Sequence, residues 1–99
     1  MGYQVILSPL ALGDLEQIVR YVAKHDPQAA ERLGNRLIDQ AESLRDLPQR
    51  GSNVRSRPGV RKLLLWPYLI FYRVSEQSRS VEVLRFWHGA QDPKQLRLG

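Results

Sequence analysis

The sequence predicts an α+β fold in which two helices pack against one antiparallel sheet, as two layers. Three observations lead to this class. Residues 3–7 form a short β-prone apolar run, residues 9–47 show two amphipathic helical patterns, and three strand-like runs lie between residues 61 and 87. A chain of 99 residues has room for a single domain, expected over residues 1–99, with a small core.

Both helices are expected to start at a capping residue followed by proline. Ser8 and Asp26 can each accept a hydrogen bond from an otherwise unpaired backbone N–H, and Pro9 and Pro27 suit the first helical position. The first apolar stripe consists of Leu15, Ile18, Val19 and Val22. The second consists of Ala30, Leu33, Leu37, Ala41 and Leu44. The second helix should end before Pro48. Only about three residues join the two predicted helices, and so short a connection makes the pair an antiparallel hairpin.

A basic loop and three strands are expected to follow the helices. Residues 49–59 are rich in Arg, Ser, Gly and Pro and have no periodicity, which is typical of a loop. Residues 61–65, 68–74 and 81–87 are strand-like, and the short gaps between them require antiparallel pairing. Residues 89–99 are predicted to be a polar tail that contains at most one helical turn.

Alternation along the strands predicts which side chains face the helices. The side chains expected to point inward are those of Tyr68, Ile70, Tyr72, Leu84 and Phe86. The side chains expected on the opposite face are those of Leu69, Phe71, Arg73, Val83, Arg85 and Trp87. Two helices cover only one face, and a mixture of aromatic residues and arginines is enriched at binding surfaces. We therefore expect a partner polypeptide on the outer face, although a homodimer would also cover it.

The composition excludes several classes of protein. The chain has no cysteine, which rules out disulfides and thiolate metal sites. It has no secretory leader pattern and no run close to the roughly 20 apolar residues of a membrane span. These features predict a cytoplasmic protein without a metal ion or other cofactor and without membrane contact.

The net charge of +5 is distributed unevenly along the chain. Residues 1–46 carry five Lys or Arg and seven Asp or Glu, whereas residues 47–99 carry ten and three. A basic half of this kind favours an acidic partner, either nucleic acid or an acidic protein segment. A solvated basic surface that maintains solubility explains the charge equally well.

Short motifs occur in a fixed order from residue 3 to residue 93. They are Tyr3-x-Val5-x-Leu7-Ser8-Pro9, Asp14-Leu15, Asp26-Pro27, Leu47-Pro48, Gly59-Val60-Arg61, the run Tyr68–Val74, and His88-Gly89-x-x-Asp92-Pro93. No single motif is specific, but the ordered set resembles the RelE/ParE toxin superfamily over nearly the whole chain.

This resemblance implies the toxin of a type II toxin–antitoxin system, the kind of pair that causes growth arrest and plasmid stabilisation. Family antitoxins usually have a DNA-binding N-terminal part and an extended C-terminal segment that wraps the toxin. An acidic or amphipathic segment would suit both the basic half and the two-sided sheet. The resemblance is compatible with a toxin homodimer or a toxin–antitoxin heterotetramer.

The superfamily has two branches with different targets. RelE-like members cut mRNA on the ribosome, whereas ParE-like members inhibit DNA gyrase. RNA cleavage needs a base, an acid and cations, and RelE-like nucleases place an arginine in the middle strand. Here Leu69 and Phe71 occupy that part of the strand, and no tyrosine follows Tyr72. The remaining nuclease candidates are His88, Arg61, Lys62 and Arg85. A lone histidine before glycine is more often a structural hydrogen-bonding residue.

The segment from His88 to Pro93 resembles the ParE-like form of its motif, except that Gln91 stands where arginine is common. We therefore expect a non-enzymatic gyrase inhibitor with no catalytic residues. The candidates for target contact are Arg61, Arg73, Arg85, His88 and Gln91, and those for antitoxin contact are Leu69, Phe71, Val83 and Trp87. The alternatives are a ribosome-dependent mRNA endonuclease and, because of Gln91, a non-toxic regulator that only binds antitoxin.

Overall fold

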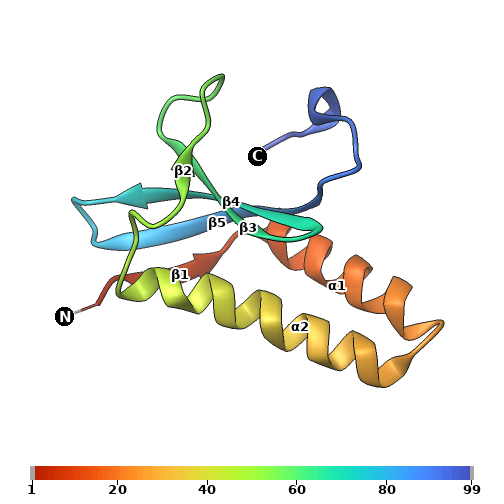
Figure 1. Cartoon of the computed structure of the whole chain (residues 1–99). Coiled ribbons are helices and arrows are strands. Elements are labelled where there is room, and N and C mark those ends of the chain that lie inside the picture. Colours follow the sequence, from red (N-terminus) through yellow and green to blue (C-terminus); the bar gives the residue numbers. More distant parts are fainter. Residues whose placement is uncertain (1, 99) are drawn as a thin grey trace.

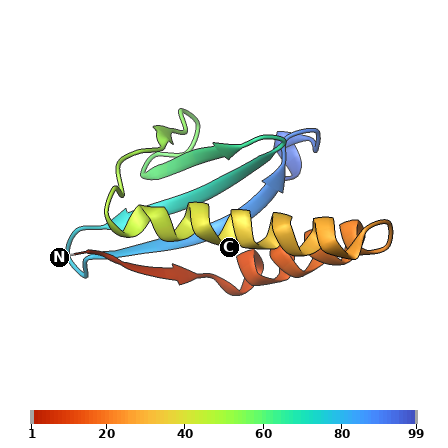
Figure 2. The ribbon, with the colours of Figure 1, turned by 60° about the horizontal axis from the view of Figure 1, so that its bottom comes forward.

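The computed structural model describes residues 2–98, except for the side chain of Pro93. Within these residues two helices lie on one face of a five-stranded sheet (Figures 1 and 2). The helices are α1 (Pro9–Ala23) and α2 (Pro27–Glu42). The strands are β1 (Gln4–Leu7), β2 (Ser52–Asn53), β3 (Val60–Leu65), β4 (Tyr68–Ser75) and β5 (Ser80–His88). The predicted α+β class and antiparallel helix hairpin are confirmed.

Both predicted helix caps are present. The Ser8 hydroxyl accepts a hydrogen bond from the Ala11 N–H at 3.1 Å and donates one to the Leu84 carbonyl at 3.0 Å. The Asp26 carboxylate accepts from the N–H groups of Gln28 and Ala29, both at 3.1 Å. These bonds satisfy donors that a helix start otherwise leaves unpaired. Ser8 also joins the start of α1 to β5, so one residue fixes both the helix and its position on the sheet.

The sheet has the order β1-β5-β4-β3-β2. The meander β3-β4-β5 is antiparallel, as predicted, and β1 pairs in parallel with β5 from Gln4↔Ser80 to Leu7↔Val83. The connection between these two parallel strands is long, as parallel pairing requires, and runs through the helix hairpin and the strands β2 to β4. The prediction of an entirely irregular loop at residues 49–59 was wrong, because β2 lies within it and pairs with β3.

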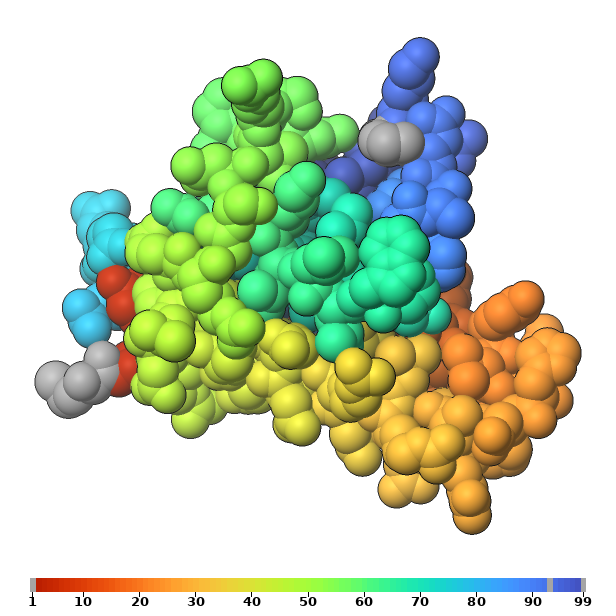
Figure 3. Space-filling model, viewed as in Figure 1, coloured from red at the N-terminus to blue at the C-terminus, as the bar shows by residue number. Residues whose placement is uncertain are grey.

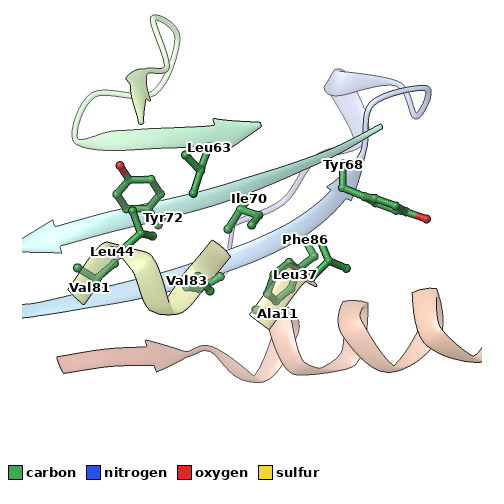
Figure 4. Close-up of a cluster of buried hydrophobic side chains, with 11 residues drawn as sticks. Ala11, Leu37, Leu44, Leu63, Tyr68, Ile70, Tyr72, Val81, Val83 and Phe86 are labelled. Atoms are coloured by element: carbon green, nitrogen blue, oxygen red, sulfur yellow. The ribbon is translucent and has the colours of Figure 1, made fainter. Parts of the chain in front are cut away.

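The main core lies between the helices and the sheet (Figure 4). Tyr68, Ile70 and Tyr72 of β4 point into it, as the alternation predicted. The helices contribute Ala11 from α1 together with Leu37 and Ala41 from α2, and Leu44 lies in the turn that follows α2. The burial of this apolar surface fixes the helix hairpin on the sheet.

A β-bulge in β5 reverses two of the predicted orientations. Tyr72 pairs with Val83, whereas the preceding Phe71 pairs with Arg85, so Leu84 has no partner of its own in β4. Strict alternation had placed Val83 on the outer face and Leu84 in the core. The structure buries Val83 completely on the helix side and places Leu84 in the outer cluster. The extra residue shifts the alternation, which explains both errors.

The outer face is partly covered by the chain itself. Its buried cluster, called here the outer cluster, consists of Val60, Phe71, Leu84, Trp87 and Leu96. Val54 from the loop before β3 and Leu98 from the tail pack against it. Figures 1 and 3 show the loop and the C-terminal tail projecting from the sheet on the side opposite the helices. The loop and the tail therefore cover part of the face on which a partner polypeptide was expected. The expected helical turn occurs in the tail as a 3-10 turn, Pro93–Gln95.

Candidate functional site

A groove on the outer face combines apolar and charged side chains. We call it the outer groove, and the side chains that define it are Leu10, Arg57, Arg73, Glu82, Leu84 and Leu98. Arg73 and Glu82 are neighbours in register on β4 and β5, and Arg73 is exposed. The Arg57 guanidinium donates to the Leu96 carbonyl at 2.8 Å and so ties the loop to the tail. The groove lies where the N-terminal end of α1, the loop and the tail meet the sheet.

Arg85 is held in an ion pair that sequence reasoning did not find. Its Nε and Nη2 donate to the two carboxylate oxygens of Asp14 in α1, at 2.6 and 2.8 Å. The two side chains are only 14% and 13% exposed. The Asp14 carboxylate also accepts a hydrogen bond from the Phe86 N–H at 3.1 Å. Phe86 lies in the part of β5 that no longer pairs with β1. The hydrogen bonds to Asp14 raise the pKa of Arg85, and its charge is neutralised locally.

Arg85 has two further contacts on the outer face. Its Nη1 donates to the Arg97 carbonyl in the tail, and its guanidinium lies 5.3 Å from the centre of the Trp87 ring. The pair of Asp14 and Arg85 therefore joins α1, β5 and the tail. The sequence signal for this link was weak, because an acid on a helix face is ordinary until its partner strand is known.

Arg61 fixes the start of the basic loop. Its Nη1 donates to the Gly51 carbonyl at 2.7 Å and to the Gln49 carbonyl at 3.4 Å. The hydroxyl of Tyr72 accepts from the Gly51 N–H and donates to the Pro48 carbonyl, both at 2.9 Å. Burial raises the pKa of Tyr72. A Cβ atom at residue 51 would lie 2.6 Å from the Tyr72 hydroxyl oxygen, so the close packing requires glycine.

His88 and Gln91 lie together in the turn after β5. The Nδ1 atom of His88 accepts from the Ala90 N–H at 3.0 Å, and its own backbone N–H donates to Oε1 of Gln91 at 3.3 Å. The imidazole packs edge-on against the Tyr68 ring, with 5.3 Å between the ring centres. The acceptor role of Nδ1 places the proton of the neutral imidazole on Nε2.

The four nuclease candidates do not gather in one site. Arg61 pairs with Tyr72 and His88 pairs with Tyr68, both on the helix side of the sheet. Lys62 and Arg85 both pair with Phe71, whose side chain belongs to the outer cluster. Arg85 and His88 nevertheless line one cleft beside α1, where the Arg85 guanidinium is bound to Asp14, and neither Arg61 nor Lys62 belongs to that lining. The four side chains therefore cannot surround one scissile phosphate together.

The four candidates for antitoxin contact differ in accessibility. Leu69 is partly exposed beside the outer cluster, whereas Phe71 and Trp87 are buried within it, at 5% and 7% exposure. Val83 is completely buried in the main core. Sequence reasoning missed the tail residues Leu96 and Leu98, because two leucines in a polar segment gave no periodic pattern.

Comparison with known proteins assigns the family. A family model described as the ParE toxin of the type II toxin–antitoxin system parDE matches residues 5–93. The chain belongs to the ParE toxin family. This toxin is 34% identical over 95 residues to Toxin RelE1 of Caulobacter vibrioides, covering 92% of this chain and 98% of that protein. The predicted RelE/ParE relationship and a type II toxin identity at superfamily level are confirmed.

Two solved structures share the toxin's fold. One is the chromosomal ParDE TA system from P. aeruginosa, with a TM-score of 0.73, 26% identity, and coverage of 87% of this chain and 95% of that chain. The other is the toxin–antitoxin complex RelBE2 from Mycobacterium tuberculosis, with a TM-score of 0.68, 25% identity, and coverage of 89% and 99%. One is a ParDE system and the other a RelBE complex, so both branches of the superfamily share this overall fold and the fold does not separate the two targets.

Two negative findings apply to the part of the toxin that the structure describes. No helix within residues 2–98 is both long and apolar enough to cross a membrane. In the same residues no three His, Asp or Glu side chains come together in a way that could hold a metal ion.

Proposed function

We propose that this toxin inhibits DNA gyrase by direct protein contact and that a cognate antitoxin holds it inactive. The observation that carries the choice of target is that the four nuclease candidates do not gather in one site, since Arg85 and His88 line a cleft beside α1 whereas Arg61 and Lys62 do not. Arg85 is neutralised by Asp14, and Arg61 is occupied by loop carbonyls. Inhibition by contact requires a complementary surface instead of a precise acid, base and cation geometry.

The outer groove supports the antitoxin part of the proposal. Arg57 and Arg73 lie beside the apolar side chains of Leu10, Leu84 and Leu98, with Glu82 as the acid among the lining residues. An acidic amphipathic segment would complement both the charge and the apolar surface. The two solved structures of similar fold are a ParDE toxin–antitoxin system and a RelBE2 toxin–antitoxin complex, which supports a cognate antitoxin for this chain.

The proposal is tested in cells by asking which nucleic acid is damaged when the toxin acts. The toxin is induced without antitoxin, and chromosomal DNA breaks and the 5′ ends of mRNA fragments are mapped. A gyrase inhibitor should produce gyrase-dependent DNA breaks while mRNA stays intact. Ribosome-dependent mRNA cleavage without DNA breaks would contradict the proposal and support the nuclease alternative. Normal growth with abundant folded toxin would support the non-toxic regulator.

A further inference from the structure

A second depression lies on the helix side of the molecule, away from the outer groove. We call it the α1 cleft, and the side chains used to define it are Ile18, Tyr21, Tyr68, Phe86, His88 and Gln91. The cleft exists because β1 pairs only with the first part of β5, up to Val83. The remainder of β5 has α1 beside it, and a helix leaves a wider gap than a hydrogen-bonded strand.

Tyr68 is the unusual residue of the α1 cleft. The residue belongs to the main core and is only 9% exposed, and its hydroxyl makes no hydrogen bond with any described residue. Figure 4 shows its ring projecting away from the other labelled core residues, with the hydroxyl at the outer end. Among the described residues the fully buried side-chain oxygen without a partner is Gln40 Oε1, so the Tyr68 hydroxyl is accessible from the cleft although its ring is buried. A tyrosine with a buried ring and an accessible hydroxyl can donate a hydrogen bond to a bound partner. Burial also raises the pKa of Tyr68, which keeps the hydroxyl protonated as a donor.

Aromatic surface is exposed at and near the α1 cleft. Tyr21 is 67% exposed and Trp66 is 76% exposed, and a Cβ atom on Gly89 would lie 3.7 Å from the Trp66 ring. Trp66 is thus next to the turn that follows His88. Tyrosine and tryptophan are among the residues enriched at the energetic centres of protein interfaces.

The α1 cleft differs from the outer groove in charge. The cation and the acid in its lining, Arg85 and Asp14, are bound to each other by two hydrogen bonds. The other polar groups in the lining are neutral amide, hydroxyl or imidazole groups. A phosphate would find no unpaired Arg or Lys among these residues, and an acidic segment would find better partners in Arg57 and Arg73 of the outer groove.

We propose that the α1 cleft binds an uncharged polypeptide segment of the toxin's protein target. An apolar anchor side chain packs against Ile18 and Tyr21, and a main-chain carbonyl of the segment accepts a hydrogen bond from the Tyr68 hydroxyl. The acidic antitoxin segment binds elsewhere, in the outer groove. This inference rests on the proposed function, because it requires the target to be a protein.

The test compares two cleft variants with a matched control. Tyr68→Phe removes only the unpaired hydroxyl, and Tyr21→Ala removes an exposed ring, so neither should prevent folding. Leu47→Ala changes a 62% exposed apolar residue in the segment after α2, outside the cleft lining.

Each variant is titrated against purified gyrase and, separately, against purified cognate antitoxin. We expect gyrase binding to weaken about tenfold for Tyr68→Phe and about thirtyfold for Tyr21→Ala. Antitoxin binding, and both affinities of Leu47→Ala, should stay within about twofold of wild type.

Several results would overturn the inference. Wild-type gyrase affinity in both cleft variants would show that the target does not use the cleft. Equal losses of gyrase and antitoxin affinity would make the antitoxin its occupant. Binding of single-stranded RNA that Tyr21→Ala abolishes would assign the cleft to nucleic acid.

Failure of the gyrase proposal itself is distinguishable. If wild-type toxin arrests growth but does not bind gyrase, the same variants are scored for growth arrest. If the cleft variants lose growth arrest but still bind antitoxin, the result would support binding of a different protein target in the α1 cleft. If the cleft variants still arrest growth, the result would contradict the inference that the α1 cleft binds the target.

Discussion

At the residue scale, Tyr72 illustrates how one side chain can determine the course of a loop. Its ring is completely buried, and its hydroxyl joins the Pro48 carbonyl to the Gly51 N–H. Tyr72→Phe would leave both groups without this partner. We expect the free energy of unfolding to fall by about 1–3 kcal/mol, as measured by urea denaturation. Tyr21→Phe is the matched control, because Tyr21 is exposed; equal stability of the two variants would contradict this role.

The alkaline pH dependence of stability belongs to the same scale. Burial raises the pKa values of Tyr68 and Tyr72 above those of the unfolded chain. The folded state therefore holds these protons more tightly, and the stability that results is complete below about pH 10 and is lost as pH rises through the folded pKa values. Urea denaturation from pH 8 to 11.5 should show this decline, and the double variant Tyr68→Phe, Tyr72→Phe should show a shallower one. An unchanged slope in the double variant would refute the assignment.

Asp14 is expected to be more important for stability than for target contact. Asp14→Asn would leave the nearly buried guanidinium of Arg85 without its carboxylate and would weaken the bond to the Phe86 N–H. We expect a loss of about 3 kcal/mol in the free energy of unfolding, since removing one partner leaves a buried charge uncompensated. The double variant Asp14→Asn, Arg85→Met should recover part of that loss. A single variant as stable as wild type would contradict the structural role of the pair.

At the element scale, local signals predicted the helices, and nonlocal pairing explains the errors. Ser8 and Asp26 marked the helix starts, because a capping side chain accepts hydrogen bonds only from backbone N–H groups of the next few residues. The bulge at Leu84 could not be predicted in the same way, since it depends on the β4 register and on the bond from Ser8. Of the proposed contact residues on β5, Val83 was misplaced, whereas Trp87 lies on the outer face as predicted, because the inserted residue offsets the alternation before the bulge from the alternation after it.

The C-terminal tail is an element that its polar composition concealed. Leu96 is 6% exposed in the outer cluster, and its carbonyl accepts from Arg57. Leu96→Ala should lower the free energy of unfolding by about 2 kcal/mol, as measured by urea denaturation. Leu64→Ala, at a 59% exposed position, is the control and should change it by less than about 0.5 kcal/mol. Similar losses in both variants would show that the tail does not pack as described.

At the scale of the whole molecule, the two faces have different chemistry. The outer groove is basic and apolar, whereas the α1 cleft is lined by aromatic and neutral polar groups together with an internally paired Asp14 and Arg85. We therefore expect antitoxin affinity to fall by about tenfold or more between 0.05 and 0.5 M salt. The double variant Arg57→Gln, Arg73→Gln should flatten this dependence, as measured by titration calorimetry. A wild-type salt dependence in that variant would exclude the groove as the acidic segment's site.

The central claim, that the toxin acts on gyrase by protein contact, is tested most directly by a supercoiling assay with purified components. Wild-type toxin is added to gyrase, relaxed plasmid and ATP, and then titrated with cognate antitoxin. The account predicts loss of supercoiling with accumulation of cleaved plasmid, and recovery as antitoxin reaches equivalence. Undiminished supercoiling in the presence of folded toxin, together with mRNA cleavage in a programmed ribosome assay, would contradict it.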